Sequence, residues 1–381
     1  MKVLHICNNF IGSTVHQKMV QASRQRGIQN VVFAPVVTMK GRVMPGEDEH
    51  AVVCVNKWDR FFFHHKQEKT YRALRKTLPH MQFDLVHAHC MFTDGNVALR
   101  IKREYGIPYL VTVNNTDINH FFRLRILLRS RGIEILREAA GIVFISDAYR
   151  KQLFDKYIPA EYREALMQKT HVIPFGVDDF WLSNLCQTKG EELQNKELRL
   201  VYAGDVCRNK NLETTLRAMG ELKARGWNVS LSVAGNVVSQ RLYKKITSDP
   251  AVTYVGILPK ENLLELYRTS NIFVMPSFHE TFGLVYAEAL SQGLPVVYSR
   301  GQGFDTQLPE GTVGFHVDPY DHRTVASALE QIAEDYPAFR RRSIESVARF
   351  DWNAVATQYQ SLYCRVAPGA DKAAAARRID E

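Results

Sequence analysis

The sequence predicts an α/β protein of two domains, each a parallel sheet wrapped by helices. The chain has 381 residues, more than one hydrophobic core usually serves, and this length suits two domains of about 150–200 residues. Segments of helical periodicity alternate with short β-like runs at residues 2–7, 31–37, 84–89, 108–114, 141–146 and 198–203. Such alternation favours parallel strands joined by crossover helices.

The first strand leads into a turn that contains a glycine. Residues 2–7 (KVLHIC) are apolar enough for a buried strand, and we expect a helix from about Val15 to Arg26. Gly12 lies between them, where the lack of a side chain allows the backbone to approach a phosphate closely. The turn has no GxGxxG spacing, and no acidic residue follows where a dinucleotide-binding fold needs one. Gly12 is therefore a candidate phosphate contact of another kind.

The net positive charge of the chain comes entirely from its first half. Residues 1–180 hold 26 Lys and Arg against 17 Asp and Glu, whereas the remainder holds 23 of each, so the net charge of +9 belongs to the first half. Two segments, 58–76 and 121–132, combine this charge with aromatic and aliphatic side chains. Each either lies on an anionic bilayer with its apolar groups inserted, or is an amphipathic surface helix packed on the sheet. The shared asymmetry favours the membrane. Nucleic acid is disfavoured, because no recognised binding motif accompanies the charge.

The cysteines and the first residues of the chain indicate the cellular compartment of the protein. Six scattered cysteines form no Cys-x-x-Cys and no His/Cys cluster in the sequence, which favours reduced thiols in a cytoplasm over disulfides or zinc. The chain opens on a strand pattern rather than a signal peptide, and no apolar run approaches the roughly 18 residues of a membrane span. We expect a cytoplasmic protein, peripheral on the inner face of the cell membrane.

The second half is organised around the stretch PSFHETFGLVYAEALSQGLPVV at residues 276–297. It predicts a strand (272–275), a loop, a helix from about Phe282 to Gln292, and a second strand near 295–298. A loop-to-helix junction presents free N–H groups and the positive end of the helix dipole, which suits a phosphate. Eight residues separate Glu280 from Glu288, roughly 80° on a helix, so the two carboxylates are not a co-facial pair. They are expected to contact different parts of one elongated ligand.

A domain boundary is expected before residue 198. The segment 171–181 (HVIPFGVDDFW) ends the first half, and the polar, irregular residues that follow resemble a linker. We therefore predict an N-terminal domain at 1–180, a linker at 181–197 and a second domain at 198–350. Residues 367–381 are expected to be a mobile tail.

These motifs resemble the signature of glycosyltransferase family 4, retaining enzymes of GT-B fold that use nucleotide sugars. In that family Glu-x-Phe-Gly is followed by an apolar run, Glu-Ala and a Gly-x-Pro-Val strand, and residues 280–296 match this pattern unbroken. Residues 171–178 are similar to the family's Val-Ile-Pro-Asn-Gly-Val-Asp. The resemblance covers about residues 1–363. It implies two Rossmann-like domains facing across a cleft, with a C-terminal helix (351–366) crossing back to the N-terminal domain.

The resemblance also implies a set of donor-binding residues. Residues 204–210 (GDVCRNK) are similar to the family's Gly-Arg-x-x-x-x-Lys-Gly, so Lys210 is expected to contact the donor diphosphate. Glu288 is expected to hold the ribose hydroxyls, and Glu280 to act on the donor sugar as a catalytic residue. The other expected donor-binding residues are Gly12, Arg208, Gly235, Ile257, His279, Phe282, Gly283 and Leu284.

Two positions depart from the family pattern. Asn114 replaces the histidine of Thr-x-His-Gly-x-Asp, which removes a proton or charge role there but retains hydrogen bonding to a sugar hydroxyl. Asn114 and Asp117, the last residue of that pattern, are both expected to be catalytic. Asp205 stands where an arginine is usual, and a carboxylate repels phosphate at close range. We hypothesise that Arg208 supplies the missing positive charge.

The implied activity is transfer of a sugar, with retention, from a nucleoside-diphosphate sugar to a glycan or lipid-linked acceptor. The implied setting is bacterial surface polysaccharide or lipopolysaccharide synthesis. Such hexosyltransferases (EC 2.4) need no metal or other cofactor, and the chain has no Asp-x-Asp. A sugar-nucleotide epimerase and a phosphorylase are alternatives on the same architecture. Asn114 and Asp205 leave open a nucleotide-sugar-binding protein with weakened catalysis.

Overall fold

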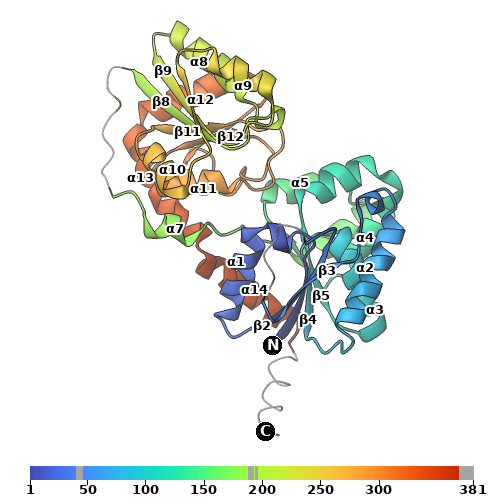
Figure 1. The fold of residues 1–381 in the computed structure, drawn as a ribbon. Helices are drawn as coiled ribbons and strands as arrows, with labels where there is room; N and C mark the ends of the chain where they lie inside the picture. Colours follow the sequence, from blue (N-terminus) through green and yellow to red (C-terminus); the bar gives the residue numbers. More distant parts are fainter. Residues whose placement is uncertain (40–45, 188–192, 194–195, 369–381) are drawn as a thin grey trace. The chain divides into compact units, whose positions relative to one another are not determined.

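The computed structural model describes residues 1–39, 46–187, 193 and 196–368, without the side chain of Arg60 (Figure 1). The chain divides into two compact units. Unit 1 comprises residues 1–145 and 149–175 together with the chain from 352 onward, and unit 2 comprises residues 146–148 and 176–351. The predicted tail lies outside the described residues from position 369, and part of the predicted linker lies outside them at 188–192 and 194–195.

Unit 1 is built on a parallel sheet whose described strands run in the order β3-β2-β1-β4-β5-β6-β7. The strands are β1 (Lys2–Ile6), β2 (Gln29–Val36), β3 (Glu49–Val53), β4 (Leu85–Ala88), β5 (Tyr109–Val113), β6 (Gly141–Phe144) and β7 (Thr170–Val172). The helices of this part are α1 (Thr14–Arg24), α2 (Phe63–Thr77), α3 (Thr93–Tyr105), α4 (Arg129–Glu138), α5 (Asp147–Lys156), α6 (Ala160–Met167) and α14 (Trp352–Val366). Short helical turns lie at η1 (Phe10–Gly12), η2 (Lys57–Arg60), η3 (Asp117–Phe122) and η4 (Ile126–Leu128).

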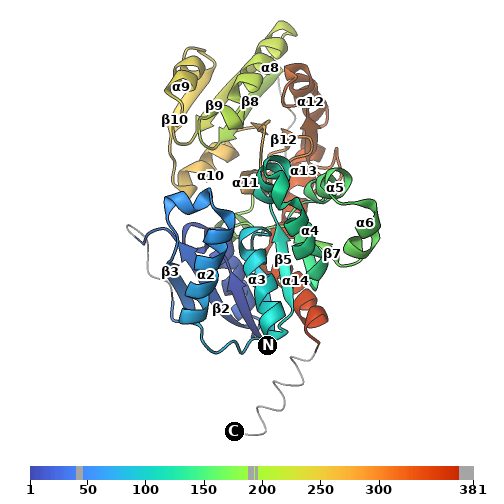
Figure 2. The same cartoon turned by 90° about the vertical axis from the view of Figure 1, so that its right-hand side faces the viewer.

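The two faces of this sheet are covered by different helices. On one face, alternate strand residues pack with α1 and α14 in one core cluster that includes Val3, Leu85, Leu110, Val143, Met19, Val355 and Tyr359. On the other face, Gly95 of α3 lies against Val111 and Ile135, each 3.0 Å from where a Cβ would stand. Leu110 and Val111 point to opposite faces because side chains alternate along a strand. Helices α2 and α3 lie side by side (Figure 2).

Unit 2 is built on a second parallel sheet, in the order β10-β9-β8-β11-β12-β13 among the described strands. Its strands are β8 (Glu197–Ala203), β9 (Asn228–Ala234), β10 (Val252–Gly256), β11 (Ile272–Met275), β12 (Val296–Ser299) and β13 (Gly314–Val317). Its helices are α7 (Asp179–Ser183), α8 (Leu212–Ala224), α9 (Gln240–Thr247), α10 (Lys260–Arg268), α11 (Leu284–Ser291), α12 (His322–Glu334) and α13 (Tyr336–Ser346), with turns at η5 (Arg208–Lys210) and η6 (Val347–Phe350). Helices α8 and α12 pack against each other (Figure 1).

The predicted fold class is confirmed. Both sheets are parallel and alternate with helices, and the C-terminal helix α14 packs against α1 in unit 1, as the resemblance implied. The edge strand β3 is not among the predicted strands, although residues 51–55 (AVVCV) are apolar, and its five residues are half-buried or exposed. All six cysteines are described, and none of them forms a disulfide bond. Within the described residues, every helix is too short or too polar to traverse a lipid bilayer.

Candidate active site

The strand order locates the site in each unit. In a parallel α/β sheet, ligands bind beyond the carboxyl ends of the strands, where the order reverses. In unit 2 that point lies between β8 and β11, so the two loops concerned are residues 204–211 and 276–283. In unit 1 it lies between β1 and β4, beside residues 7–13 and 89–93. The predicted donor-binding residues other than Gly12 all lie on unit 2.

An ion pair joins the two loops of unit 2. Nζ of Lys210 lies 2.5 Å from Oε2 of Glu280, and the two side chains keep only 22% and 12% of their exposure. Partial burial lowers the effective dielectric constant and strengthens this attraction relative to a surface pair. The structure therefore brings the predicted diphosphate contact and the predicted catalytic carboxylate together, although 70 residues separate them in the chain.

Two asparagines hold the loops at a fixed spacing. Asn209 Nδ2 donates to the carbonyl of His279 (2.8 Å) and its Oδ1 accepts from the N–H of His279 (3.1 Å). Asn211 Nδ2 donates to the carbonyls of Pro276 (2.9 Å) and Pro319 (2.7 Å). Asn211 has φ of 58°, a left-handed conformation that asparagine adopts more readily than other residues with a side chain. The sequence analysis missed both residues. The sequence contains one indication of this turn: Asn211 occupies the position of the glycine in the family's Lys-Gly pair.

A third loop supports the backbone of Glu280. Its N–H donates to Oε1 of Gln302 (3.1 Å), and its carbonyl accepts from the N–H of Gly303 (3.0 Å). A Cβ at Gly303 would stand 1.9 Å from the carbonyl oxygen of Thr281, so only glycine allows this approach. Gln302 and Gly303 were not predicted as site residues, because their contacts arise only when strands β11 and β12 pair.

The start of α11 offers free backbone donors. Gly283 precedes the helix with φ of 81°, no side chain caps the first turn, and the first turn contains no acidic residue. Such a terminus presents unpaired N–H groups and the positive end of the helix dipole. Phe282 is buried rather than directed to solvent, whereas Leu284 is half-buried. The hydroxyl of Tyr286 anchors the helix by donating to the carbonyl of Met275 (2.6 Å).

Glu288 lies in the second turn of α11 in an environment that disfavours its charge. Burial and nearby Asp178 raise the pKa of Glu288 to about 7, although Lys260 and Trp181 oppose the shift. Lys260 also pairs with Asp178, with Nζ and Oδ2 2.7 Å apart. At neutral pH the carboxyl group is therefore poised between its two protonation states, and a ligand that donates hydrogen bonds would favour the ionised form.

Arg208 lies in the same region with its charge uncompensated. Arg208 and Asp205 are both exposed, and neither forms an ion pair with a described residue. A pocket of about 420 Å³ is lined by Arg208, Asn209, Phe278, His279 and Tyr320. The structure therefore places two predicted donor-binding residues, Arg208 and His279, in one pocket of unit 2.

The loops after β9 and β10 carry the remaining predicted residues of unit 2. Gly235 has φ of 140°, and a Cβ there would stand 1.9 Å from the carbonyl oxygen of Gly204. The hydroxyl of Tyr254 donates to the carbonyl of Gly235 (2.9 Å) and fixes this loop. Ile257, directly after β10, is 72% exposed and follows Gly256, whose φ is 80°. Its apolar side chain and the adjacent backbone are thus accessible to a flat aromatic ligand such as a base.

Unit 1 presents a more open edge. Gly12 ends the turn η1, is exposed, and has no atom within 4 Å of where a Cβ would stand. Asn8 Nδ2 donates to Oγ1 of Thr93 (2.8 Å), which links the loop after β1 to the start of α3. The backbone at Gly12 is therefore accessible, as a phosphate contact requires.

Asp117 and Asn114 are tied to the backbone of unit 1. Asp117 is fully buried, and its carboxylate accepts from the N–H groups of Met91 (3.1 Å), Phe92 (3.0 Å) and Asn114 (2.9 Å). Asn114 Nδ2 donates to the carbonyl of His89 (2.6 Å). In this arrangement Asp117 joins the end of β5 to the start of α3, and its side chain has no exposed surface. The catalytic roles of Asp117 and Asn114 stay predictions.

A histidine cluster lies in the core of unit 1. His5 Nδ1 lies 3.0 Å from His89 Nε2, and His87 is hydrogen-bonded to the hydroxyls of Tyr363 (2.7 Å) and Thr112 (2.9 Å). Burial lowers the pKa of His5 to about 4 and those of His87 and His89 below the usual value, so all three are neutral at pH 7. The groups spaced closely enough for a metal ion are His5 with His87 and His89, and Cys7 with His16 and His89. The sequence analysis missed this cluster because its members are far apart in the chain. The expectation of a metal-free enzyme is not tested by this geometry and stays a prediction.

Two parallel α/β units, a C-terminal helix that returns to the first unit and sites beyond the strand ends define the GT-B architecture. Residues 13–179 match the family model of Glycosyltransferase Family 4, and residues 187–350 match that of Glycosyl transferases group 1. The chain therefore belongs to the group 1 and family 4 glycosyltransferases, which confirms the resemblance seen in the sequence.

Curated proteins and solved structures from several organisms are similar to this chain. A D-inositol 3-phosphate glycosyltransferase of Corynebacterium kroppenstedtii is 29% identical over 43% of this chain and 40% of its own length. The first two curated relatives are matched over only about two fifths of their length. Sucrose-phosphate synthase from Thermosynechococcus elongatus has a similar fold, with a TM-score of 0.73, 19% identity, and 96% and 99% of the two chains covered. An Anabaena protein, HepE, solved in complex with UDP-glucose, has a TM-score of 0.63 and 14% identity over 95% of this chain and 98% of its own.

Proposed function

We propose that the protein is a retaining glycosyltransferase that moves a sugar from a nucleoside-diphosphate sugar to a hydroxyl of a glycan or lipid-linked acceptor. The observation that carries this proposal is the Lys210–Glu280 pair, which bridges the two loops at the strand reversal of unit 2. A cation for a diphosphate and a carboxylate for a sugar hydroxyl lie side by side there. The uncapped first turn of α11 begins four residues after Glu280.

The chemistry proposed for the site is charge stabilisation. The bond between the anomeric carbon and the diphosphate oxygen breaks, the acceptor oxygen bonds to the same face of that carbon, and a diphosphate oxygen takes the acceptor proton. Lys210, Arg208 and the N–H groups at the start of α11 would meet the charge that develops on the leaving diphosphate. Glu280 would orient the sugar and Glu288 the ribose, and the reaction would need no bound metal.

The acceptor, the pathway and the location belong to this proposal as well. A basic first half and an exposed apolar surface on unit 1 suit a lipid-linked or acidic glycan acceptor. Synthesis of a bacterial surface polysaccharide or lipopolysaccharide at the inner face of the cell membrane would supply such an acceptor. Relatives solved with UDP-glucose favour a uridine nucleotide sugar as the first donor to examine.

The test is a donor screen followed by product analysis. Nucleotide sugars with different bases are first ranked by the rise in melting temperature that they cause, since a ligand that binds the native state stabilises it. The best donor is then incubated with lipid-linked and glycan acceptors, with and without EDTA, and the anomeric configuration of the product is read by NMR. Retained configuration with unchanged rate in EDTA is expected. Epimerised sugar, phosphorolysis, or binding without any turnover would each replace the proposal by the corresponding alternative.

A further inference from the structure

Unit 1 exposes a concentrated set of large apolar side chains. They belong to two segments that the sequence places about 60 residues apart: Trp58, Phe61 and Phe62 in the first, and Leu124, Ile126 and Leu127 in the second. Phe62 is 65% exposed and Leu127 is 95% exposed. Isolated exposed apolar residues are ordinary, but a contiguous patch marks a surface that another partner covers.

The two segments form one groove. It has a volume of about 720 Å³ and is lined by residues 61–65 and 124–128. An aromatic cluster beneath it fixes the two segments together: Phe63 lies 6.1 Å from Phe121 and 6.4 Å from Phe92, and Phe92 and Phe121 are stacked at 4.5 Å between ring centroids. The groove is therefore a built feature of the fold. Both segments follow the carboxyl ends of strands, β3 and β5, so they lie at the same edge of the sheet as Gly12 and Asn114.

Exposed cations directly precede both apolar segments in the chain. Lys57 and Arg123 are exposed, and neither forms an ion pair with a described residue. Arg125 lies over the ring of Phe121 at 5.8 Å. This local charge belongs to the half of the chain that holds the whole net charge of +9. Cations at the rim of an apolar surface complement anionic headgroups above hydrocarbon.

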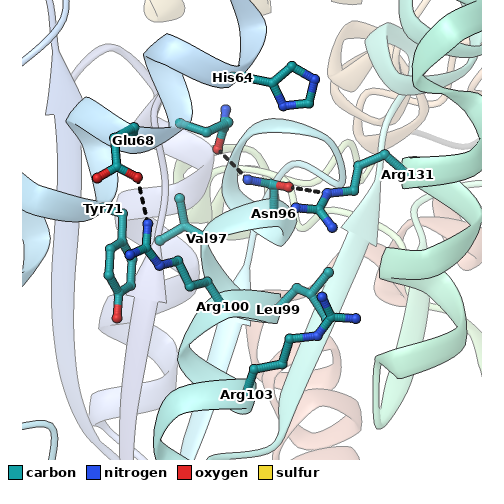
Figure 3. Close-up of a pocket in the computed structure, with 10 residues that line it drawn as sticks. His64, Glu68, Tyr71, Asn96, Val97, Leu99, Arg100, Arg103 and Arg131 are labelled. Carbon is teal, nitrogen blue, oxygen red and sulfur yellow. Dashed lines mark hydrogen bonds and ion pairs between the residues drawn. The ribbon is translucent and has the colours of Figure 1, made fainter.

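A polar pocket of about 380 Å³ adjoins the groove and shares His64 with it (Figure 3). Its arginines are already engaged: Arg100 pairs with Glu68 at 2.7 Å, and Arg131 Nε donates to Oδ1 of Asn96 at 2.8 Å (Figure 3). Arg103 pairs with Glu134 at 2.5 Å. Arg131 also pairs with Glu134 at 2.6 Å, so all three guanidinium groups are paired with carboxylates of α2, α3 and α4. This pairing disfavours the polar pocket as an anion site.

We propose that the apolar groove is the surface by which this protein docks on an anionic lipid bilayer. Leu124, Ile126 and Leu127 enter the outer hydrocarbon, the aromatic side chains of 58–62 lie at headgroup depth, and Lys57 and Arg123 contact lipid phosphates. Insertion is peripheral, since no described helix can traverse the bilayer.

A second copy of the chain is a poorer occupant. A two-fold contact through this surface would bring the same cations of both copies together, and like charges at close range oppose association. The charge at the rim therefore favours an anionic partner. The docking proposal extends the proposed function. It rests on that function in one respect only: the membrane is where the protein would meet a lipid-linked acceptor.

The experiment is flotation of the full chain with vesicles of phosphatidylcholine alone and with added phosphatidylglycerol, at low and high salt, without donor or acceptor. The double variant Phe62→Ser/Leu127→Ser is expected to bind anionic vesicles about tenfold or more weakly, because two large apolar groups no longer enter the bilayer. Arg123→Ser is expected to bind about fivefold more weakly at low salt and to lose part of the salt dependence.

Two variants serve as matched controls. Met167→Ser removes an exposed apolar side chain at the end of α6, which precedes β7 and so lies at the opposite edge of the sheet. Lys76→Ser removes an exposed cation near the end of α2, also at that edge. Both should float like the unchanged protein. Thermal unfolding verifies that each variant is folded.

The proposal is overturned by equal binding to neutral and anionic vesicles, or by flotation that survives the double variant. A change from dimer to monomer in the double variant, measured by light scattering without lipid, would assign the groove to a second copy instead. Because no turnover is needed, failed flotation leaves the transferase proposal standing. Failed transfer with normal flotation leaves the docking proposal standing.

Discussion

The carboxyl edges of the two sheets differ in the side chains that they present. In unit 2 the loops beyond β8 and β11 are fixed by side chain-to-backbone bonds from Asn209 and Asn211 and by the Lys210–Glu280 pair. In unit 1 the corresponding edge carries exposed aromatic and aliphatic side chains, and its turn at Gly12 has open space around it. Fixed loops suit a ligand whose charges need prearranged partners. An exposed apolar edge suits a partner that binds through an extended apolar surface and needs no individually placed contacts.

The largest expected effect is a loss of turnover when a carboxylate at the carboxyl edge of unit 2 is removed. Glu280→Ala should lower kcat by about 100- to 1,000-fold, because the group proposed to orient the donor sugar is lost and Lys210 loses its partner. Donor affinity should change far less. Glu288→Ala should show the reverse, a weaker donor affinity with a smaller change in kcat. Steady-state kinetics and calorimetric donor titration measure the two quantities, and equal defects in both variants would contradict the division of roles.

A pair of glycines contrasts the two edges directly. Gly235→Ala should lower the free energy of unfolding by about 3 kcal/mol, because a Cβ would clash with the carbonyl of Gly204 and φ is 140°. Gly12→Ala should leave stability unchanged within about 0.5 kcal/mol, since its Cβ meets no atom within 4 Å, while weakening donor binding. Urea unfolding measures both variants. Equal stability losses would show that the edge of unit 1 is as tightly built as that of unit 2.

An effect of intermediate size is expected at the unpaired cation of unit 2. Arg208→Ala should weaken binding of the nucleotide sugar about tenfold, because one charge near the diphosphate is removed. Lys223→Ala, which removes an exposed cation near the end of α8, is the matched control and should not change the dissociation constant. An unchanged constant for Arg208→Ala would end the hypothesis that Arg208 replaces the arginine lacking at Asp205.

The smallest effect expected is a pH dependence at Glu288. Its pKa is about 7, so the carboxyl group is largely protonated at about pH 6 and largely ionised at about pH 8. The ionised form accepts hydrogen bonds from ribose hydroxyls better, so donor affinity should rise a few-fold as the pH rises across this interval. The effect on stability has the opposite sign: the native state holds this proton more tightly than the unfolded chain, whose carboxyl pKa is 4.5, so stability is lost as the pH rises from about 4.5 through 7. Glu288→Gln should abolish both pH dependences. Donor titrations at several pH values measure the affinity, and unfolding experiments at the same pH values measure the stability.

The same contrast explains what the sequence could predict. Short motifs on one loop or helix, such as 280–288 and 204–210, can be recognised without knowing the fold. Glu280, Lys210 and the start of α11 could therefore be predicted as site residues from the sequence and the family resemblance. The contacts that hold them were not found. Gln302 reaches Glu280, and Asn209 reaches His279, only after the strands are ordered in space. Secondary-structure propensity and hydrophobic periodicity do not determine the order of the strands in a sheet.

Unit 1 was harder to interpret because its features are distributed along the chain. The histidine cluster joins β1 and β4, and the apolar groove joins residues 61–65 with 124–128. The sequence analysis identified both basic segments but left open whether they lie on a membrane or pack on the sheet. The structure shows that buried members of these segments, such as Phe63 and Phe122, pack inside, while Phe62 and Leu127 face solvent. Each segment therefore contributes to the core and to the surface.

The connectivity of α14 has a consequence for the order of folding. Residues 352–366 complete the core of unit 1, where Tyr363 bonds to His87 and Arg26 bonds to Asn353 and Thr357. Unit 2 is almost one continuous stretch of chain, so it has its whole core when residue 351 leaves the ribosome. Unit 1 begins first on the ribosome but must wait for α14, so one face of its sheet is covered only in part, by α1, during most of synthesis. The later-made unit can thus reach its native packing before the earlier one does.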